Sequence, residues 1–110
     1  MCNHDLTLLF LGRKDINLII NGVIEKLAEA EHVQWQKWAK SVSGDIEALL
    51  GLIDVENLDS NQKEFVDMVS GRIENWSRLM IDYEDLSEDE KEKDRVYARI
   101  VYEICKNELE

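Results

Sequence analysis

The stretch DINLIINGVIEKLAEAEHVQWQKWAKSV, residues 15–42, decides the fold of this chain. Its apolar side chains recur at intervals of three and four, which is the period of an α-helix with one buried face. The recurring positions are Ile16, Ile20, Val23, Leu27, Ala30, Trp38 and Val42. The chain contains no proline, the residue that most often ends a helix. We therefore predict one long helix here, which ends at Ser43-Gly44.

The same period predicts three further helices. Their predicted ranges are 45–53, 61–80 and 88–106. Asp59 or Ser60 is placed to cap the second of these, and Ser87 with Glu90 forms an S-x-x-E capping box before the last. The side chains that the last helix is predicted to bury are Val96 or Tyr97, Ile100, Val101 and Ile104. The sequence thus predicts an all-α fold of about four helices.

The length of 110 residues fits a single domain. We expect one helical domain over residues 15–110, preceded by an apolar segment over residues 1–14. The apolar run at residues 6–11, where the one strand-like pattern lies, is shorter than the ~20 residues that span a bilayer. No Lys or Arg precedes it, so we expect no secretory signal and a cytoplasmic location. Cys2 and Cys105 are then two free thiols, with a bridge between them as the alternative.

The charge is strongly negative, with 24 Asp and Glu against 13 Lys and Arg, a net charge of −11. Binding to a nucleic acid polymer depends on clustered Lys and Arg that displace counterions. An anionic membrane surface likewise attracts basic segments. We therefore expect neither nucleic acid polymers nor membranes as partners.

Two groups of side chains could carry metal chemistry. Glu29 and His32 have the E-x-x-H spacing of di-iron bundles, which need a second such pair, and the only other histidine is His4. A half-buried histidine beside a surface carboxylate is the simpler interpretation. The second group consists of carboxylates on two predicted helices, as in magnesium-dependent pyrophosphohydrolases. Its members are Glu25, Glu29, Glu31, Glu64 and Asp67.

The magnesium pattern is incomplete, because Ile24 and Ala28 stand where the paired E-E-x-x-E arrangement of those enzymes has acids. There is no glycine-rich phosphate loop, and no serine or cysteine lies in a nucleophile motif. We predict a protein that is not an enzyme and has no cofactor, with the pyrophosphohydrolase activity as the enzymatic alternative.

Aromatic and basic residues concentrate in residues 32–40 and 83–95. An indole or phenol ring offers a flat face to a nucleobase or to another helix, and a nearby arginine offers a planar donor fork. The alternative is that the tryptophans are packing residues and that Asp94 and Arg95 form surface ion pairs.

These two segments carry a family resemblance. The motifs A-E-x-x-H-x-x-W (residues 28–35) and Y-x-x-L-S-x-x-E-K-x-x-D-R-x-x-A (residues 83–98) resemble the RyR domain, the small helical repeat named from ryanodine receptors. The resemblance covers residues 28–42 and 76–104. Receptor repeats carry a stretch with glycine, proline and a G-W pair between the motifs, whereas residues 44–80 here look helical. The chain is therefore more similar to compact phage and prophage proteins that share the two ends.

The resemblance implies a function. Members of the wider family are proposed to bind adenine-nucleotide-like ligands, including nucleotide signals of antiviral defence. Carried over, it implies a ligand site made of His32, Trp35, Tyr83, Lys91 and Arg95, with an aromatic ring on the base and the two cations on phosphate. It also implies the host cytoplasm, if a phage encodes the chain.

A second hypothesis stays open beside the nucleotide ligand. The chain would be a helical protein–protein interaction module without a small ligand. It would form a homodimer through residues 6–11 or through its remaining apolar faces, or bind and inhibit a host protein.

Overall fold

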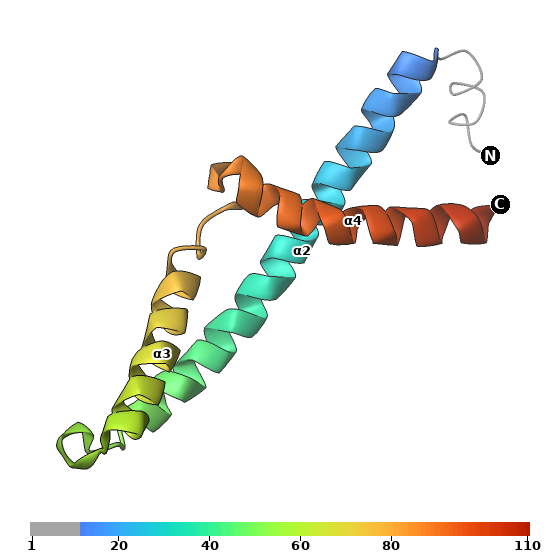
Figure 1. The fold of residues 1–110 in the computed structure, drawn as a ribbon. Helices are drawn as coiled ribbons and strands as arrows, with labels where there is room; N and C mark the ends of the chain where they lie inside the picture. Colours follow the sequence, from blue (N-terminus) through green and yellow to red (C-terminus); the bar gives the residue numbers. More distant parts are fainter. Residues whose placement is uncertain (1–11) are drawn as a thin grey trace. The chain divides into compact units, whose positions relative to one another are not determined.

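The computed structural model describes residues 12–110, in which three α-helices and two short 3-10 turns occur and no strand (Figure 1). The helices are α2 (Arg13–Leu50), α3 (Ser60–Ser77) and α4 (Glu88–Leu109), and the turns are η1 (Val55–Asn57) and η2 (Tyr83–Asp85). The predicted all-α class is confirmed. The apolar run at residues 6–11, His4 and Cys2 lie outside the described residues.

The predicted helix stop at Ser43-Gly44 is wrong, because α2 continues through it to Leu50. No glycine in the described chain has a positive φ, so Gly44 does not form the left-handed turn that ends a helix. Val42, Ile46 and Leu50 keep the apolar face in phase across it. That continuity outweighs the ~1 kcal/mol cost of one helical glycine. The helix predicted over 45–53 is therefore the end of α2, and residues 12–110 form three helices rather than the four predicted.

Side-chain caps fix the starts of the other two helices. Of the two residues predicted to cap α3, Asp59 does so: its Oδ1 accepts from the Gln62 amide at 2.8 Å, and Gln62 Oε1 accepts from the Asp59 amide at 3.0 Å. Ser87 Oγ accepts from the Glu90 amide at 3.2 Å, as predicted for α4. The Glu90 carboxylate accepts instead from Lys93 Nζ, at 2.9 Å. Both α3 and α4 therefore begin where a cap satisfies an orphan amide.

The chain divides into two compact units, one of residues 12–31 with 87–110 and the other of residues 32–86. In the first unit, α4 crosses the early part of α2 (Figure 1). Ala28 of α2 and Ala98 of α4 are both completely buried there. Small side chains at these positions suit a close helix crossing, since the interaxial distance depends on the residues at the contact. The expectation of one domain over residues 15–110 stays a prediction.

The prediction of which face α4 buries is wrong. Its large apolar side chains are roughly half exposed: Val96 48%, Tyr97 61%, Ile100 52% and Ile104 57%. Of the predicted set, only Val101 is half-buried. The helix turns a different side inward because Arg95 bonds to Glu25 of α2 and Ala98 is buried. The apolar stripe therefore remains on the surface.

In the second unit, α3 runs back along the later part of α2, so that the two helices form a hairpin (Figure 1). Its most buried residues come from both helices and from the segment after α3. They are His32, Ala39, Ile73, Tyr83 and Leu86. Among all described residues, no large side chain is completely buried. Much of the packing is therefore between side chains that keep some contact with water.

Candidate functional site

His32 lies inside the second unit and is 3% exposed. Its Nε2 lies 2.7 Å from the carbonyl oxygen of Ile81. A carbonyl can only accept, so Nε2 carries the proton and donates. The histidine thereby ties α2 to the segment that follows α3. This agrees with the predicted half-buried histidine, and its partner is a backbone carbonyl.

The aromatic residues of the second unit contact one another. The His32 ring stacks near Trp35, with centroids 6.0 Å apart and planes 16° apart, and Tyr83 tilts against His32 at 6.3 Å. Trp76 of α3 meets Trp35 edge-on at 6.4 Å and Trp38 at 5.5 Å. Such pairs are worth about 0.5–1.5 kcal/mol beyond their buried area. The cluster therefore joins the two helices of the hairpin.

Arg95 of α4 bonds to α2 in the first unit, and only 19% of its side chain is exposed. Its Nε donates to both oxygens of Glu25, at 3.2 and 2.9 Å, and its Nη2 donates to Glu25 Oε1 at 2.7 Å. Its Nη1 donates to Glu88 Oε2 at 2.9 Å. This is the forked, bidentate pairing for which the guanidinium is suited. Arg95 therefore clamps α4 to α2.

Neighbouring charges on α4 extend this network. The hydrogen bond and positive charge of Arg95 hold the pKa of Glu88 below its ordinary value. Arg99 Nη1 donates to Glu92 Oε2 at 2.6 Å, which lowers the pKa of Glu92 and raises that of Arg99. Lys91 pairs with Glu88 at 3.7 Å. The cations of this surface thus face carboxylates.

The five predicted ligand residues therefore fall in two groups. His32, Trp35 and Tyr83 lie together in the second unit, where their rings contact one another. Lys91 and Arg95 belong to the first unit, where both pair with Glu88. The ligand site built from all five stays a prediction.

Two residues with a clear structural role were not predicted. Gln36 Nε2 donates to the Ile81 carbonyl at 2.7 Å and to the Leu79 carbonyl at 3.4 Å, beside the bond from His32. The spacing of four between His32 and Gln36 puts two polar side chains on one helical face and could have revealed this pair. Glu25 offered no such signal as the partner of Arg95, because 70 residues separate the two.

A hollow of about 270 Å³ in the first unit is lined by five polar or charged side chains and one apolar side chain. Its lining residues are Asn21, Ile24, Glu25, Glu92, Arg95 and Arg99. Both arginines donate to carboxylates that line the same hollow. An anion entering here has to displace those carboxylates.

The residues considered for metal binding are not gathered into a site. Within residues 12–110, no group of three or more His, Cys, Asp or Glu side chains is placed to hold a metal ion. Glu25, one of the five carboxylates of the magnesium hypothesis, instead accepts three hydrogen bonds from Arg95. Cys105 is a free, exposed thiol.

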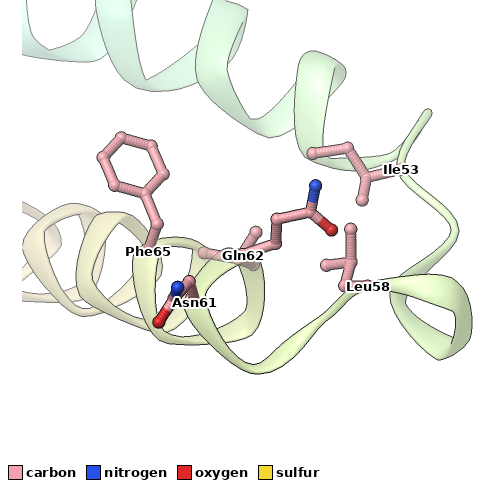
Figure 2. Close-up of a pocket in the computed structure, with 6 residues that line it drawn as sticks. Ile53, Leu58, Asn61, Gln62 and Phe65 are labelled. Atoms are coloured by element: carbon pink, nitrogen blue, oxygen red, sulfur yellow. The ribbon is translucent and has the colours of Figure 1, made fainter.

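Two adjoining apolar hollows lie at the end of the hairpin in the second unit. One, of about 260 Å³, is lined only by apolar side chains: Ile46, Leu49, Leu50, Ile53, Phe65, Val66 and Val69. The other, of about 380 Å³, shares Ile53, Phe65 and Val66 with it and adds Leu58, Asn61 and Gln62. Figure 2 shows Phe65 on one side, Ile53 and Leu58 on the other, and Gln62 between them. We call the two hollows together the hairpin groove.

Within the described part of the chain, none of the helices combines the length and apolar character needed to cross a membrane. Comparison with family models, curated proteins and solved structures finds no match. The resemblance to the RyR domain therefore stays a prediction that rests on the two motifs.

Proposed function

We propose that the chain is a helical protein–protein interaction module that pairs with a second copy through α4. The observation that carries this proposal is the exposure of apolar side chains. Sixteen large apolar residues among those described remain at least 41% exposed. Large exposed apolar side chains that lie next to one another are typical of interaction sites.

The apolar residues of α4 form one stripe. Val96, Ile100 and Ile104 follow one another at intervals of four and so share a face. Ala98, which α4 buries, lies on the other side, since two residues turn a helix by about 200°. The stripe therefore points away from the α2 contact, and a partner can cover it without disturbing that contact.

The positions of the apolar residues along the stripe favour a second copy as that partner. In an antiparallel pair of α4 helices centred on Ile100, Val96 of one copy faces Ile104 of the other. Lys93 then lies opposite Asn107, since both stand seven residues from the centre. A two-fold symmetric interface repeats each favourable contact twice. The apolar contacts along the stripe thus make it self-complementary.

Sedimentation velocity of the full chain over a range of concentrations tests this proposal. We expect the wild-type chain to associate and Ile100→Glu to weaken association by at least about tenfold, because the buried charge occurs twice in a symmetric pair. Leu109→Glu is the matched control. Leu109 is 88% exposed and off the stripe, so this variant should associate like the wild type. A wild-type chain that stays monomeric at every concentration contradicts the proposal.

The nucleotide-derived ligand implied by the resemblance has less support from the geometry. Arg95, its predicted phosphate contact, already donates to Glu25 and Glu88. A phosphate must compete with two carboxylates in a chain of net charge −11. Calorimetric titration with a panel of linear and cyclic adenine nucleotides tests this second function. Nucleotide binding that is lost in Arg95→Met supports this function. The absence of binding heat with every nucleotide of the panel contradicts it.

A further inference from the structure

We propose that the hairpin groove binds a basic amphipathic helix of another protein. The proposal rests on the proposed function as an interaction module. It adds a second surface, in the other unit of the chain, and the chemistry of the partner that this surface takes.

The groove is apolar and open to an incoming side chain. Leu49 of α2 and Phe65 of α3 line it and are 60% and 62% exposed. Its two hollows, of about 260 and 380 Å³, adjoin through shared lining residues. Each can receive a side chain of leucine or phenylalanine size. An amphipathic helix presents such side chains at intervals of three and four, which is how helices bind in grooves.

One polar residue that lines the groove is held in place by the cap of α3. Gln62 lies between Phe65 and Ile53 in Figure 2. Its side-chain amide and backbone amide are both bonded to Asp59, in the capping box that starts α3. A partner therefore spends little free energy on ordering this side chain.

The chemistry of the partner follows from the charges around the groove. Residues 45–67 contain seven acidic residues and one lysine, a net charge of −6 out of −11 for the chain. Carboxylates directly adjoin five lining residues in sequence. These neighbouring pairs are Asp45-Ile46, Ile53-Asp54, Leu58-Asp59, Glu64-Phe65 and Val66-Asp67.

These carboxylates are available to cations of a partner. Within residues 12–110, none of the seven acids of this segment forms an ion pair. Asp54 accepts a side-chain hydrogen bond from Asn57, and Asp59 serves as the cap of α3. An apolar groove with an acidic rim is complementary to a helix with an apolar face and flanking lysines or arginines.

The acidic rim also gives this surface a different binding preference from that of the α4 stripe. The stripe is a row of apolar side chains and suits a second copy, whereas two copies of the groove would bring two acidic rims together. Like charges facing each other oppose binding. The groove therefore takes a different protein.

A peptide of leucine and lysine at helical spacing, carrying a fluorescent label, is the probe. Its binding to the full-length chain is followed by fluorescence anisotropy. We expect saturable binding that weakens as salt is added. Phe65→Glu should weaken binding by about tenfold or more, because it puts a charge where an apolar side chain docks. Phe65 is largely exposed, so the fold should tolerate this change.

Three controls make the test specific. Met68→Glu changes an exposed apolar residue of the same helix that does not line the groove, and it should leave binding unchanged. A peptide of the same composition without an apolar face should bind much more weakly, as should a leucine–glutamate peptide. The proposal is overturned if the amphipathic basic peptide does not bind, if it binds the Phe65 and Met68 variants equally, or if either control peptide binds as tightly.

The outcome is independent of α4 self-association. Ile100→Glu should leave peptide binding intact, and Phe65→Glu should leave the sedimentation of the chain unchanged. If Phe65→Glu instead abolishes self-association, the groove holds a second copy and the basic partner is wrong. If only the Ile100 result fails, the proposed function fails while the groove proposal stands.

Discussion

Replacing Arg95 by methionine should destabilise the first unit, because Arg95 clamps α4 to α2. Methionine keeps much of the apolar stem but removes the guanidinium, which makes three hydrogen bonds to Glu25 at 2.7–3.2 Å. An exposed ion pair contributes about 0–1 kcal/mol, whereas breaking a buried one costs about 3–5 kcal/mol. Arg95 is 19% exposed and Glu25 42%, so water screens the pair in part. We expect a loss of about 1–2 kcal/mol in the free energy of unfolding.

Urea unfolding followed by circular dichroism measures this loss, and a melting temperature lower by about 5–10 °C should accompany it. Arg78→Met is the matched control. Its ion pair with Glu74 is 3.0 Å long, but both side chains are more than two-thirds exposed. That change should cost only about 0.3–0.5 kcal/mol. A double-mutant cycle with Glu25→Gln should give a coupling energy of about 1 kcal/mol or more between Glu25 and Arg95.

The reasoning is refuted if Arg95→Met costs no more than Arg78→Met, or if the coupling energy is near zero. Either result would show that the fork does not hold the two helices. Arg95 would then again be a candidate for contacting the phosphate of a ligand.

Three further predictions concern other parts of the chain. The pKa values of Glu88 and Glu92 are lowered, so their ionised forms stabilise the folded state fully above the ordinary pKa of 4.5. This stabilisation is lost as the pH falls through the lowered pKa values. In urea unfolding at several pH values, the free energy of unfolding of the variant with both residues changed to Gln should therefore decrease less toward acid pH than that of the wild type. Gly44→Ala should stabilise the chain by up to about 1 kcal/mol, since an added Cβ meets nothing within 4 Å in mid-helix; unchanged or lower stability in a thermal melt contradicts the continuous α2. Asp59→Ala should cost about 1 kcal/mol by removing the cap of α3, and an equal loss in Ser60→Ala would contradict the assignment of the cap.

Local signals in the sequence predicted the parts of the fold that local interactions determine. The caps at Asp59 and Ser87 are short-range hydrogen bonds; Ser87 was predicted outright, and Asp59 is one of the two residues predicted for its cap. The Ser43-Gly44 stop was wrong because the apolar phase from Val42 to Ile46 competes with the turn preference of the two residues. A single glycine does not decide between these two effects.

Pairing between residues far apart in the chain could not be predicted from the sequence. The inward face of α4 is set by Arg95 and its partner Glu25, 70 residues away, so the apolar period alone assigned the buried face wrongly. The candidate site shows the same contrast between local interactions, which were predicted, and long-range interactions, which were not. The spacing of His32 and Trp35 predicted one helical face, but the carbonyl of Ile81 that His32 bonds could not be predicted from that spacing.

The concentration dependence of the sedimentation coefficient, measured on the wild-type chain and on Ile100→Glu, tests the central claim most directly. A coefficient that rises with concentration for the wild type and stays at the monomer value for the variant is the predicted result. Identical monomer values for both chains would contradict the claim that the exposed stripe of α4 is an interface.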